Sequence, residues 1–460
     1  MSLSAALMVI DDAISAATAL HHGGRHHDAE SLLREAIAHH PASHALHNAC
    51  GVMQASQGRY RDAVASYRAA LRTGSGEAAI WTNLGNALTH LRLLDSAVAC
   101  HDAALARAPD EGGLHYNRGI SLAEAGRHGE AVAAFSRALA LAPHHGMAQW
   151  DRGRSYLHLG NLVSGWIDYD VRLRNGLVPK RAVPGRRWEG GAYAGQRLVL
   201  LAEQGFGDML WVSRYLPLVR ALGGELIVEC PPELAGLYQS QGLSDRVVIQ
   251  GEALPAADWH AWQCSLPGLF TRDLDSIAQP VAFVPDPARV AALRPVIEAA
   301  GPLLRVGIVW SGSVTFARNA ERARPLEPFL DAFDQPGVQL FSLQKGPPEA
   351  ELAQHRRGQR VIDLAPGLRG FHDTAAAMSL LDLVIMTDSA VAHLAGCMGK
   401  PVWVLLGANA HWLWLQDRGD TAWYPSMRLV RPRGPLGWTQ VFDSASAELM
   451  RLSLRHAGLL

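Results

Sequence analysis

Three short stretches of this sequence place acidic, basic and hydroxyl side chains directly after apolar runs. They read EQGFGD at residues 203–208, SGSVTFARNAER at 311–322 and TDSA at 387–390. The apolar runs are typical of buried strands in a parallel sheet, and ligands bind outside the carboxyl ends of such strands. These three stretches are therefore the candidates for a binding or catalytic site.

In EQGFGD, Gly205 and Gly207 allow a tight turn, and Asp208 opens the following helix. One interpretation is that the Asp208 carboxylate simply caps that helix. The other is that it lies in the mouth of a cleft, where it can accept a proton from a hydroxyl group. The two glycines do not form a GxGxxG dinucleotide fingerprint, so they do not decide between these interpretations.

The stretch TDSAVAH leaves a similar choice open. Asp388 or Ser389 can cap a helix, or the unpaired N–H groups at that helix start can hold a phosphate. Ala390 and Ala392 keep side-chain bulk away, and His393 lies one turn beyond Ser389 on the same side of the helix.

Cations are concentrated after the apolar run that precedes 311–322 and after one further apolar run. Arg318, Arg322 and Arg324 follow the run at 304–310, and Lys345 follows VQLFSLQ. Such groups can clamp a diphosphate, whose negative charge grows when it leaves. A solvated loop is the alternative interpretation for the arginines.

Two tandem α/β units are expected to position these loops. From Arg197 the chain alternates short apolar strands with Gly-containing loops and amphipathic helices, and a second such set starts at LLRVGIVWSGS. We place the first unit at 196–295 and the second at 296–460. The expected architecture is thus a pair of Rossmann-like domains with parallel sheets.

The N-terminal third is periodic instead. Aligned in rows of 34, residues 1–178 show one column of Gly51, Gly85, Gly119 and Gly153, and another of Gly58, Gly126 and Gly160 in which Arg92 fills the gap. Further columns hold Pro41, Pro109 and Pro143, and Ala29, Ala63, Ala97 and Ala131. This pattern is similar to the tetratricopeptide repeat, with about five helix pairs stacked into a solenoid that binds a protein on its concave face.

The periodic part ends in an atypical unit. The last repeat departs from the pattern at LVSGWIDYDVRLRNG, as a capping unit with a different neighbour does. Residues 179–195 are rich in Pro, Gly and Arg and are interpreted as a linker. The histidine doublets of the repeats show no fixed ligand spacing, so we interpret them as solvated surface and expect no metal.

Composition narrows the partners and the compartment. The chain has 460 residues, a formal net charge of -1 and a pI near 7.1, so nucleic acid and anionic lipid are disfavoured as partners. Its five cysteines are scattered singly, which favours reduced thiols and a cytoplasmic setting. The first twenty residues lack a basic start and are interpreted as the first repeat helix, and no membrane span is expected.

Taken together, TDSAVAHLAGCMGKPVWVLLG, the upstream QGFGD, the VGIVWSGS stretch with its later Arg, and WLWLQDRGDTAWYPSMRLVRP resemble the heptosyltransferase-like glycosyltransferases with a GT-B fold. The bacterial branch in which tetratricopeptide repeats precede the transferase domain is the most similar. The resemblance implies inverting transfer of a sugar from a nucleotide-sugar donor to an acceptor, without a cofactor or an obligatory metal. It also implies that the second half holds most of the donor.

The same resemblance assigns roles to single residues. Asp208 matches the proposed base, and Asp388, Ser389 and His393 match the turn that contacts the donor. The cationic loop is matched by Arg322, with Ser311 and Ser313 where hydroxyl groups reach phosphate, and Lys345 matches a strand-end lysine that meets the diphosphate. The acceptor implied is a protein captured by the repeats, with flagellin or another surface protein as one context.

The sequence also departs from the family. The first half is short for an acceptor domain, which suggests that the solenoid supplies part of the acceptor site. Ala317 and Ala323 stand where the family loop often has a basic residue and a serine. The alternative function is therefore a repeat scaffold with a degenerate transferase domain that binds a partner without chemistry.

Overall fold

A computed structural model of the chain describes residues 10–74, 76–178, 180–432 and 437–460. The chain divides into two compact units, Met1–Tyr156 and Leu157–Leu460. The beginning of the predicted first repeat helix, residues 1–9, lies outside the described residues.

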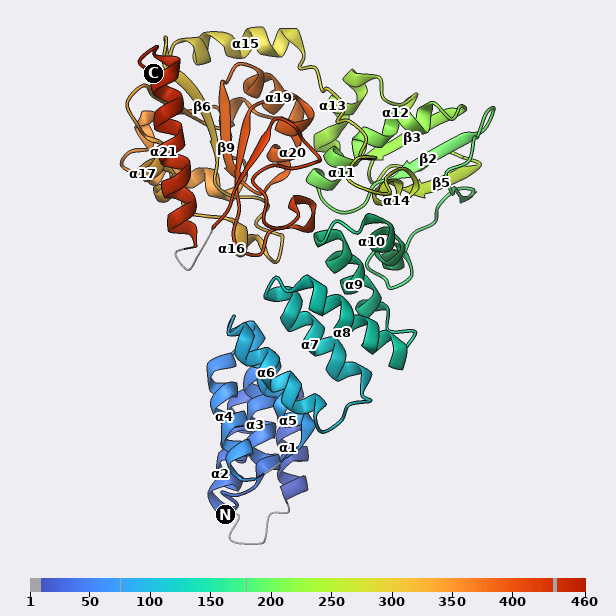
Figure 1. Ribbon diagram of the computed structural model, residues 1–460, viewed down its shortest axis with the longest axis vertical. Coiled ribbons are helices and arrows are strands. Elements are labelled where there is room, and N and C mark those ends of the chain that lie inside the picture. Colours follow the sequence, from blue (N-terminus) through green and yellow to red (C-terminus); the bar gives the residue numbers. More distant parts are fainter. Residues whose placement is uncertain (1–9, 75, 179, 433–436) are drawn as a thin grey trace. The chain divides into compact units, whose positions relative to one another are not determined.

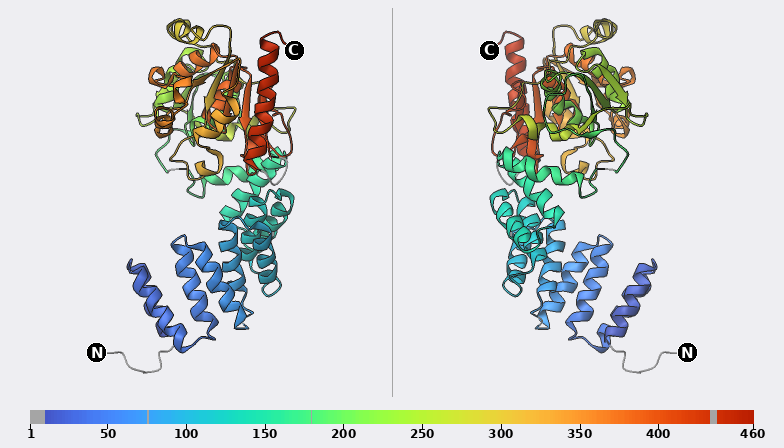
Figure 2. Two further views of the ribbon diagram at one scale, coloured as in Figure 1. Left: turned by 90° about the vertical axis from the view of Figure 1, so that its left-hand side faces the viewer. Right: turned by 90° about the vertical axis from the view of Figure 1, so that its right-hand side faces the viewer.

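The helical part follows the predicted 34-residue period (Figures 1 and 2). The first helices of the successive pairs are α1 (Ile10–His22), α3 (His44–Ser56), α5 (Ala78–His90), α7 (Gly112–Glu124) and α9 (Gly146–His158). The second helices are α2 (His26–His39), α4 (Tyr60–Arg72), α6 (Leu94–Leu105), α8 (His128–Leu141) and α10 (Leu162–Tyr169). Corresponding helices begin 34 residues apart, which confirms the repeat pattern read from the sequence.

Each glycine column has a structural cause. A Cβ atom on Gly51, Gly85 or Gly119 would lie 2.5, 2.6 or 2.5 Å from a ring of the second helix of the same pair. These rings belong to Tyr67, His101 and Phe135. Only glycine lets the paired helices approach this closely.

The second column serves the turn between paired helices. Gly58, Gly126 and Gly160 all have φ of 75° there, a conformation that L-residues rarely adopt. Arg92, which fills the gap in the column, adopts the same left-handed conformation with φ of 62°. The turn geometry is therefore kept even where the glycine is missing.

Substitution of Gly119 by Ala is expected to destabilise the solenoid by about 1–3 kcal/mol, because the added methyl group must displace the Phe135 ring. Gly129, in the partner helix α8, has open space at its Cβ position, so Gly129→Ala is the matched control and should change stability by less than about 1 kcal/mol. Thermal unfolding followed by circular dichroism measures both. Equal effects of the two substitutions would contradict the close-approach explanation.

The first sheet of the second unit is parallel and has the strand order β1-β5-β2-β3-β4. Its strands are β1 (Arg186–Arg187), β2 (Arg197–Leu201), β3 (Glu225–Cys230), β4 (Arg246–Ile249) and β5 (Trp259–Trp262). β1 lies within the segment that the sequence predicts as a linker, and it pairs with β5. The chain order reverses between β2 and β5, so the loops after these two strands flank the switch point at which parallel sheets bind ligands.

The second sheet is also parallel, with the order β11-β10-β9-β6-β7-β8. Its strands are β6 (Leu304–Val309), β7 (Val338–Ser342), β8 (Val361–Asp363), β9 (Leu383–Thr387), β10 (Val402–Leu405) and β11 (Met427–Val430). Its switch point lies between β6 and β9. The two stretches singled out in this half, 311–322 and 387–390, follow these two strands.

Apolar helices cover the second sheet. Phe329 and Phe333 of α17 (Leu326–Phe333) and Phe442 of α21 (Trp438–His456) pack in one cluster with Val306 and Ile308 of β6. The connecting helix α15 (Pro287–Glu298) contains the predicted boundary between the halves at 295/296, and it packs against α19 (Phe371–Ser379). This cluster fixes the sheet from which the second-half loops emerge.

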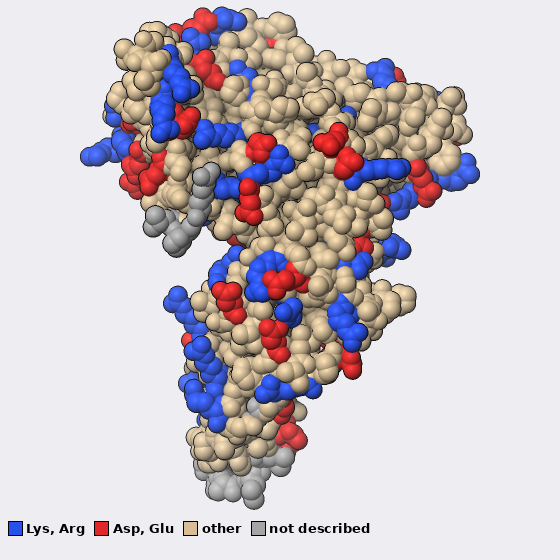
Figure 3. All heavy atoms as spheres, viewed as in Figure 1, with Lys and Arg blue, Asp and Glu red and all other residues tan. Residues whose placement is uncertain are grey.

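Two properties expected from composition are visible in the structure. All five cysteines are buried free thiols. On the visible face, basic and acidic side chains are interspersed (Figure 3), in keeping with the net charge of -1.

None of the helices in the described part of the chain combines the length and the hydropathy of a membrane span.

Candidate functional site

The site forms where two helix N-termini meet. α11 (Phe206–Val212) follows β2 of the first sheet, α20 (Ala390–Cys397) follows β9 of the second, and the two helices pack together. A Cβ atom on Gly207 would lie 2.8 Å from the His393 ring and 3.5 Å from the Cα of Ala390. The absence of a side chain at Gly207 thus lets the two predicted loops come together.

Asp208 stands in the first turn of α11. Its Oδ2 accepts a hydrogen bond of 3.0 Å from the backbone N–H of Gly205, so the carboxylate does cap the helix start. Burial raises the pKa of Asp208 to about 6, and the negative charges of Glu203 and Asp388 act in the same direction against that hydrogen bond. A carboxylate with a pKa this close to neutrality is also suited to general base catalysis, so the two interpretations are compatible.

The raised pKa of Asp208 has a measurable effect on stability. Because the pKa in the folded state, about 6, exceeds that of an ordinary Asp, the carboxyl group contributes stability that is full below about pH 4 and lost as pH rises through 6. Asp208→Asn is therefore expected to be more stable than the wild type at pH 7, by at most about 3 kcal/mol, with a difference that vanishes near pH 4. Thermal unfolding at both pH values, with the exposed Asp275→Asn as control, measures this. A difference independent of pH would contradict it.

The turn before α20 places Asp388 and Ser389 differently from a simple cap. Ser389 occupies the N-cap position, but its side chain makes no capping hydrogen bond; its hydroxyl group lies 3.9 Å from the Met386 sulfur. Asp388 is buried, which raises its pKa, while the positive charge of Arg322 lowers it. The N-terminus of α20 therefore lacks a side-chain cap at Ser389, and a cation is close to the preceding carboxylate.

His393 joins the two helices as a neutral ring. Its Nδ1 lies 3.1 Å from the Tyr424 hydroxyl, and its ring stacks on Trp414 with centroids 5.2 Å apart. Burial lowers the pKa of His393 to about 3, and the positive charges of His411, Arg214 and Arg322 lower it further. At neutral pH this histidine can therefore exchange hydrogen bonds but carries no charge.

The cationic loop follows β6 and brings one arginine to the junction. Arg322 ends the short helix α16 (Asn319–Arg322), with its guanidinium over the Phe316 ring at 4.6 Å, and its charge acts on both Asp388 and His393. By contrast, Arg318 forms an ion pair with Glu321. Of the three arginines, Arg322 is the one whose charge reaches the Asp388 turn.

The remaining predicted residues are arranged less uniformly. Ser311 is buried and its hydroxyl accepts a hydrogen bond from the Asn319 amide at 3.1 Å, whereas Ser313 is exposed and bonds to Thr315 at 2.7 Å. The Lys345 ammonium donates to the Ala365 carbonyl at 2.9 Å, just after β8. In the structure, the Lys345 ammonium is therefore hydrogen-bonded beside the edge strand β8.

The sequence did not predict a second set of contacts that holds α11 and the residues after it against the second half. Arg214 donates to the Trp423 carbonyl at 2.9 Å, and its guanidinium lies 4.8 Å over the Tyr424 ring. Cys397 donates to the Leu210 carbonyl at 3.5 Å. The sequence signal near these contacts is the WYPSM stretch, which contains Trp423 and Tyr424.

Two further observations concern possible metal ligands and a cavity near the last repeat helix. In the described ranges, no three His, Cys, Asp or Glu side chains are grouped as ligands of a metal ion would be. An open cavity of about 530 Å³ lies beside α10, lined in part by Trp166, Trp188 and Trp262. None of the residues predicted for the site lines that cavity.

The N-terminal part is a tetratricopeptide-repeat solenoid, a scaffold for protein interaction. The tetratricopeptide repeat family matches residues 15–76, 54–112 and 116–165. Among curated proteins, the chain is similar to Protein FlbA of Caulobacter vibrioides, with 34% identity over 304 residues, covering 59% of this chain and 50% of that protein. Because residues 1–178 are less than two fifths of the chain, this similarity extends into the α/β part. The chain spans about half the length of this relative.

Solved structures of other proteins are similar to part of the chain. YrrB, titled a TPR protein with an unusual peptide-binding site, covers 37% of this chain and 89% of its own, with 19% identity and a TM-score of 0.33. MamA covers 37% and 95%, with 18% identity and a TM-score of 0.33. Pseudomonas aeruginosa pilF covers 46% and 86%, with 18% identity and a TM-score of 0.36.

Proposed function

We propose that the α/β part is a glycosyltransferase domain of GT-B type that moves a sugar from a nucleotide-sugar donor to a protein held by the repeats. The observation that carries this proposal is the junction of α11 and α20. It joins a carboxylate with a pKa of about 6, from the first half, to a helix N-terminus and a cation from the second. A transferase that must deprotonate an acceptor and stabilise a leaving diphosphate needs these groups together.

Each group has a defined task in the proposed reaction. Asp208 accepts the proton of the acceptor hydroxyl as its oxygen attacks the anomeric carbon of the donor. The bond from that carbon to the diphosphate oxygen breaks, which inverts the configuration. Arg322 and the N–H groups at the start of α20 then stabilise the departing diphosphate. Neutral His393 exchanges a hydrogen bond with the donor or holds α20 against Gly207.

A donor site at this place agrees with the topology of the second sheet. Arg322 and Ser389 emerge from loops after β6 and β9, on either side of the switch point. Ser311 lies at the same edge, and Ser313 reaches a phosphate with its exposed hydroxyl only if that hydroxyl leaves Thr315. Lys345 reaches the diphosphate only if its ammonium leaves the Ala365 carbonyl and Glu349.

The proposal is tested by following a labelled sugar. The protein is incubated with isotope-labelled nucleotide sugars and a bacterial protein extract that includes flagellin. Label is expected on protein with one of the donors and with no other. Absence of label with every donor, while the protein still captures an extract protein through its repeats, would favour the non-catalytic scaffold, which Ala317 and Ala323 also favour.

A further inference from the structure

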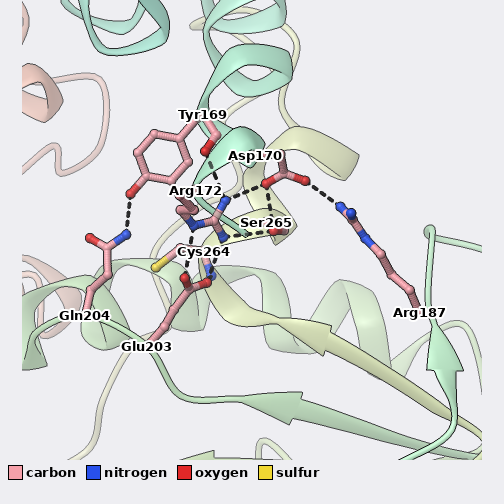
Figure 4. Close-up of polar contacts among 8 residues, drawn as sticks. All are labelled: Tyr169, Asp170, Arg172, Arg187, Glu203, Gln204, Cys264 and Ser265. Atoms are coloured by element: carbon pink, nitrogen blue, oxygen red, sulfur yellow. Dashed lines mark hydrogen bonds and ion pairs between the residues drawn. The ribbon is translucent and has the colours of Figure 1, made fainter. Parts of the chain in front are cut away.

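Asp208 lies in the 203–208 loop. The first residues of this loop form hydrogen bonds with the end of the helical repeats. After α10, the short 3₁₀ helix η1 (Asp170–Leu173) places Arg172 against Glu203, the residue that opens the 203–208 loop (Figure 4). Arg172 Nε and Nη2 donate to the two Glu203 oxygens at 3.0 and 2.7 Å. Both side chains are 1% exposed, so the ion pair is shielded from water.

The pair belongs to a closed polar network. Glu203 also accepts the backbone N–H of Cys264, which follows β5, at 3.0 Å. Arg172 donates to Ser265 at 2.9 Å and to Asp170 at 2.5 Å, and Asp170 in turn accepts from Arg187 of β1 at 2.6 Å. The network thus ties η1 to the loops after both β2 and β5, which flank the switch point of the first sheet.

The next residue of the loop is held in an unusual conformation. Gln204 has φ of 62°, in the left-handed region, where a residue other than glycine stays only when its surroundings hold it. Its amide donates to the Tyr169 hydroxyl at 2.7 Å. The turn fixed in this way leads directly to Gly205, whose N–H binds the Asp208 carboxylate.

We propose that Tyr169 and Arg172 are positioning residues, which hold the 203–208 loop so that Asp208 faces the start of α20. The assignment of a catalytic task to this placement rests on the proposed function. It also explains why the last repeat departs from the repeat pattern at WIDYDVRLRNG: Tyr169, Asp170 and Arg172 serve the loop and not a further repeat.

The placement itself is tested by hydrogen exchange of the full chain, read by mass spectrometry on peptides within 203–212. Tyr169→Phe removes the acceptor of the Gln204 amide and is expected to speed exchange there by about fivefold or more. Tyr193→Phe is the matched control, because Tyr193 is another buried tyrosine of the same compact unit and its hydroxyl has no hydrogen-bond partner. Equal exchange in the two variants would overturn the proposal.

The catalytic consequence is tested by comparing turnover with donor binding. Tyr169→Phe and Arg172→Lys are expected to lower kcat by about 10- to 100-fold while leaving the KM for the donor unchanged, since the donor residues belong to the second half. Arg197→Lys is the control for Arg172→Lys, because Arg197 forms its ion pair with Glu225 at the opposite end of β2.

The outcomes separate the two proposals. If the wild type transfers sugar and both variants keep its kcat, the positioning role is overturned and the glycosyltransferase function stands. If the wild type transfers no sugar, the proposed function fails. Faster loop exchange in Tyr169→Phe alone would then still support the hold on the loop, and its absence would refute it.

Discussion

Asp208→Asn is expected to reduce sugar transfer by about 10²- to 10⁴-fold, the range that general base catalysis contributes. The amide that replaces the carboxylate cannot accept the proton of the acceptor hydroxyl. It still offers an oxygen to the Gly205 N–H, so the helix start is kept. Donor binding should therefore be nearly unchanged, and turnover measured at saturating donor reads the effect directly.

Asp275→Asn is the control for this substitution, because Asp275 is an exposed carboxylate of the same half. Its turnover should equal that of the wild type. A second signature is the pH profile of the wild type, in which kcat should fall about tenfold per pH unit below the Asp208 pKa of about 6. An Asp208→Asn variant that keeps turnover but loses donor binding would contradict the assigned role.

Arg322→Ala is expected to abolish about half or more of the stabilisation that a nucleoside diphosphate gives to the protein. At a hundredfold excess over the dissociation constant, a ligand stabilises the wild type by about 2.7 kcal/mol. Charge-assisted hydrogen bonds contribute about 1.5–3 kcal/mol each, so their loss weakens binding by at least about tenfold. The measurement is the ligand-dependent shift in unfolding temperature.

Arg318→Ala provides the matched control for Arg322→Ala. It removes the same charge from the same loop, but Arg318 forms an ion pair with Glu321 and its charge does not act on Asp388. This variant should keep the ligand-dependent shift. If both substitutions reduce the shift equally, the loop acts by its net charge and Arg322 has no specific role.

The repeats and the strands were predictable because their causes are local. Gly119 recurs in its column because a ring from the partner helix occupies the space of its Cβ, and that contact repeats with the sequence period. Apolar strands such as β2 and β9 were evident from their runs. β1 was not, because Arg186 and Arg187 carry no apolar signal and pair with β5 only after the chain has folded back.

The site was predictable in its loops but not in its contacts. The rule that ligand loops follow strand ends predicts that Asp208 and Asp388 lie at the carboxyl-end edges of their sheets, but it gives no orientation of one sheet against the other. The approach of Gly207 to His393 spans 186 residues of sequence. The Arg172–Glu203 pair was hidden for the same reason, since nothing local marks two charged residues as partners.

The most direct test of the central claim is a thermal unfolding screen of the wild-type protein against nucleoside diphosphates and nucleotide sugars. If the junction of α11 and α20 is a donor site, one nucleoside diphosphate and its sugar conjugates should raise the unfolding temperature, and the other bases should not. This result would also identify the base of the donor. No shift with any of these ligands at millimolar concentration would contradict the donor site and leave the chain a tetratricopeptide-repeat scaffold.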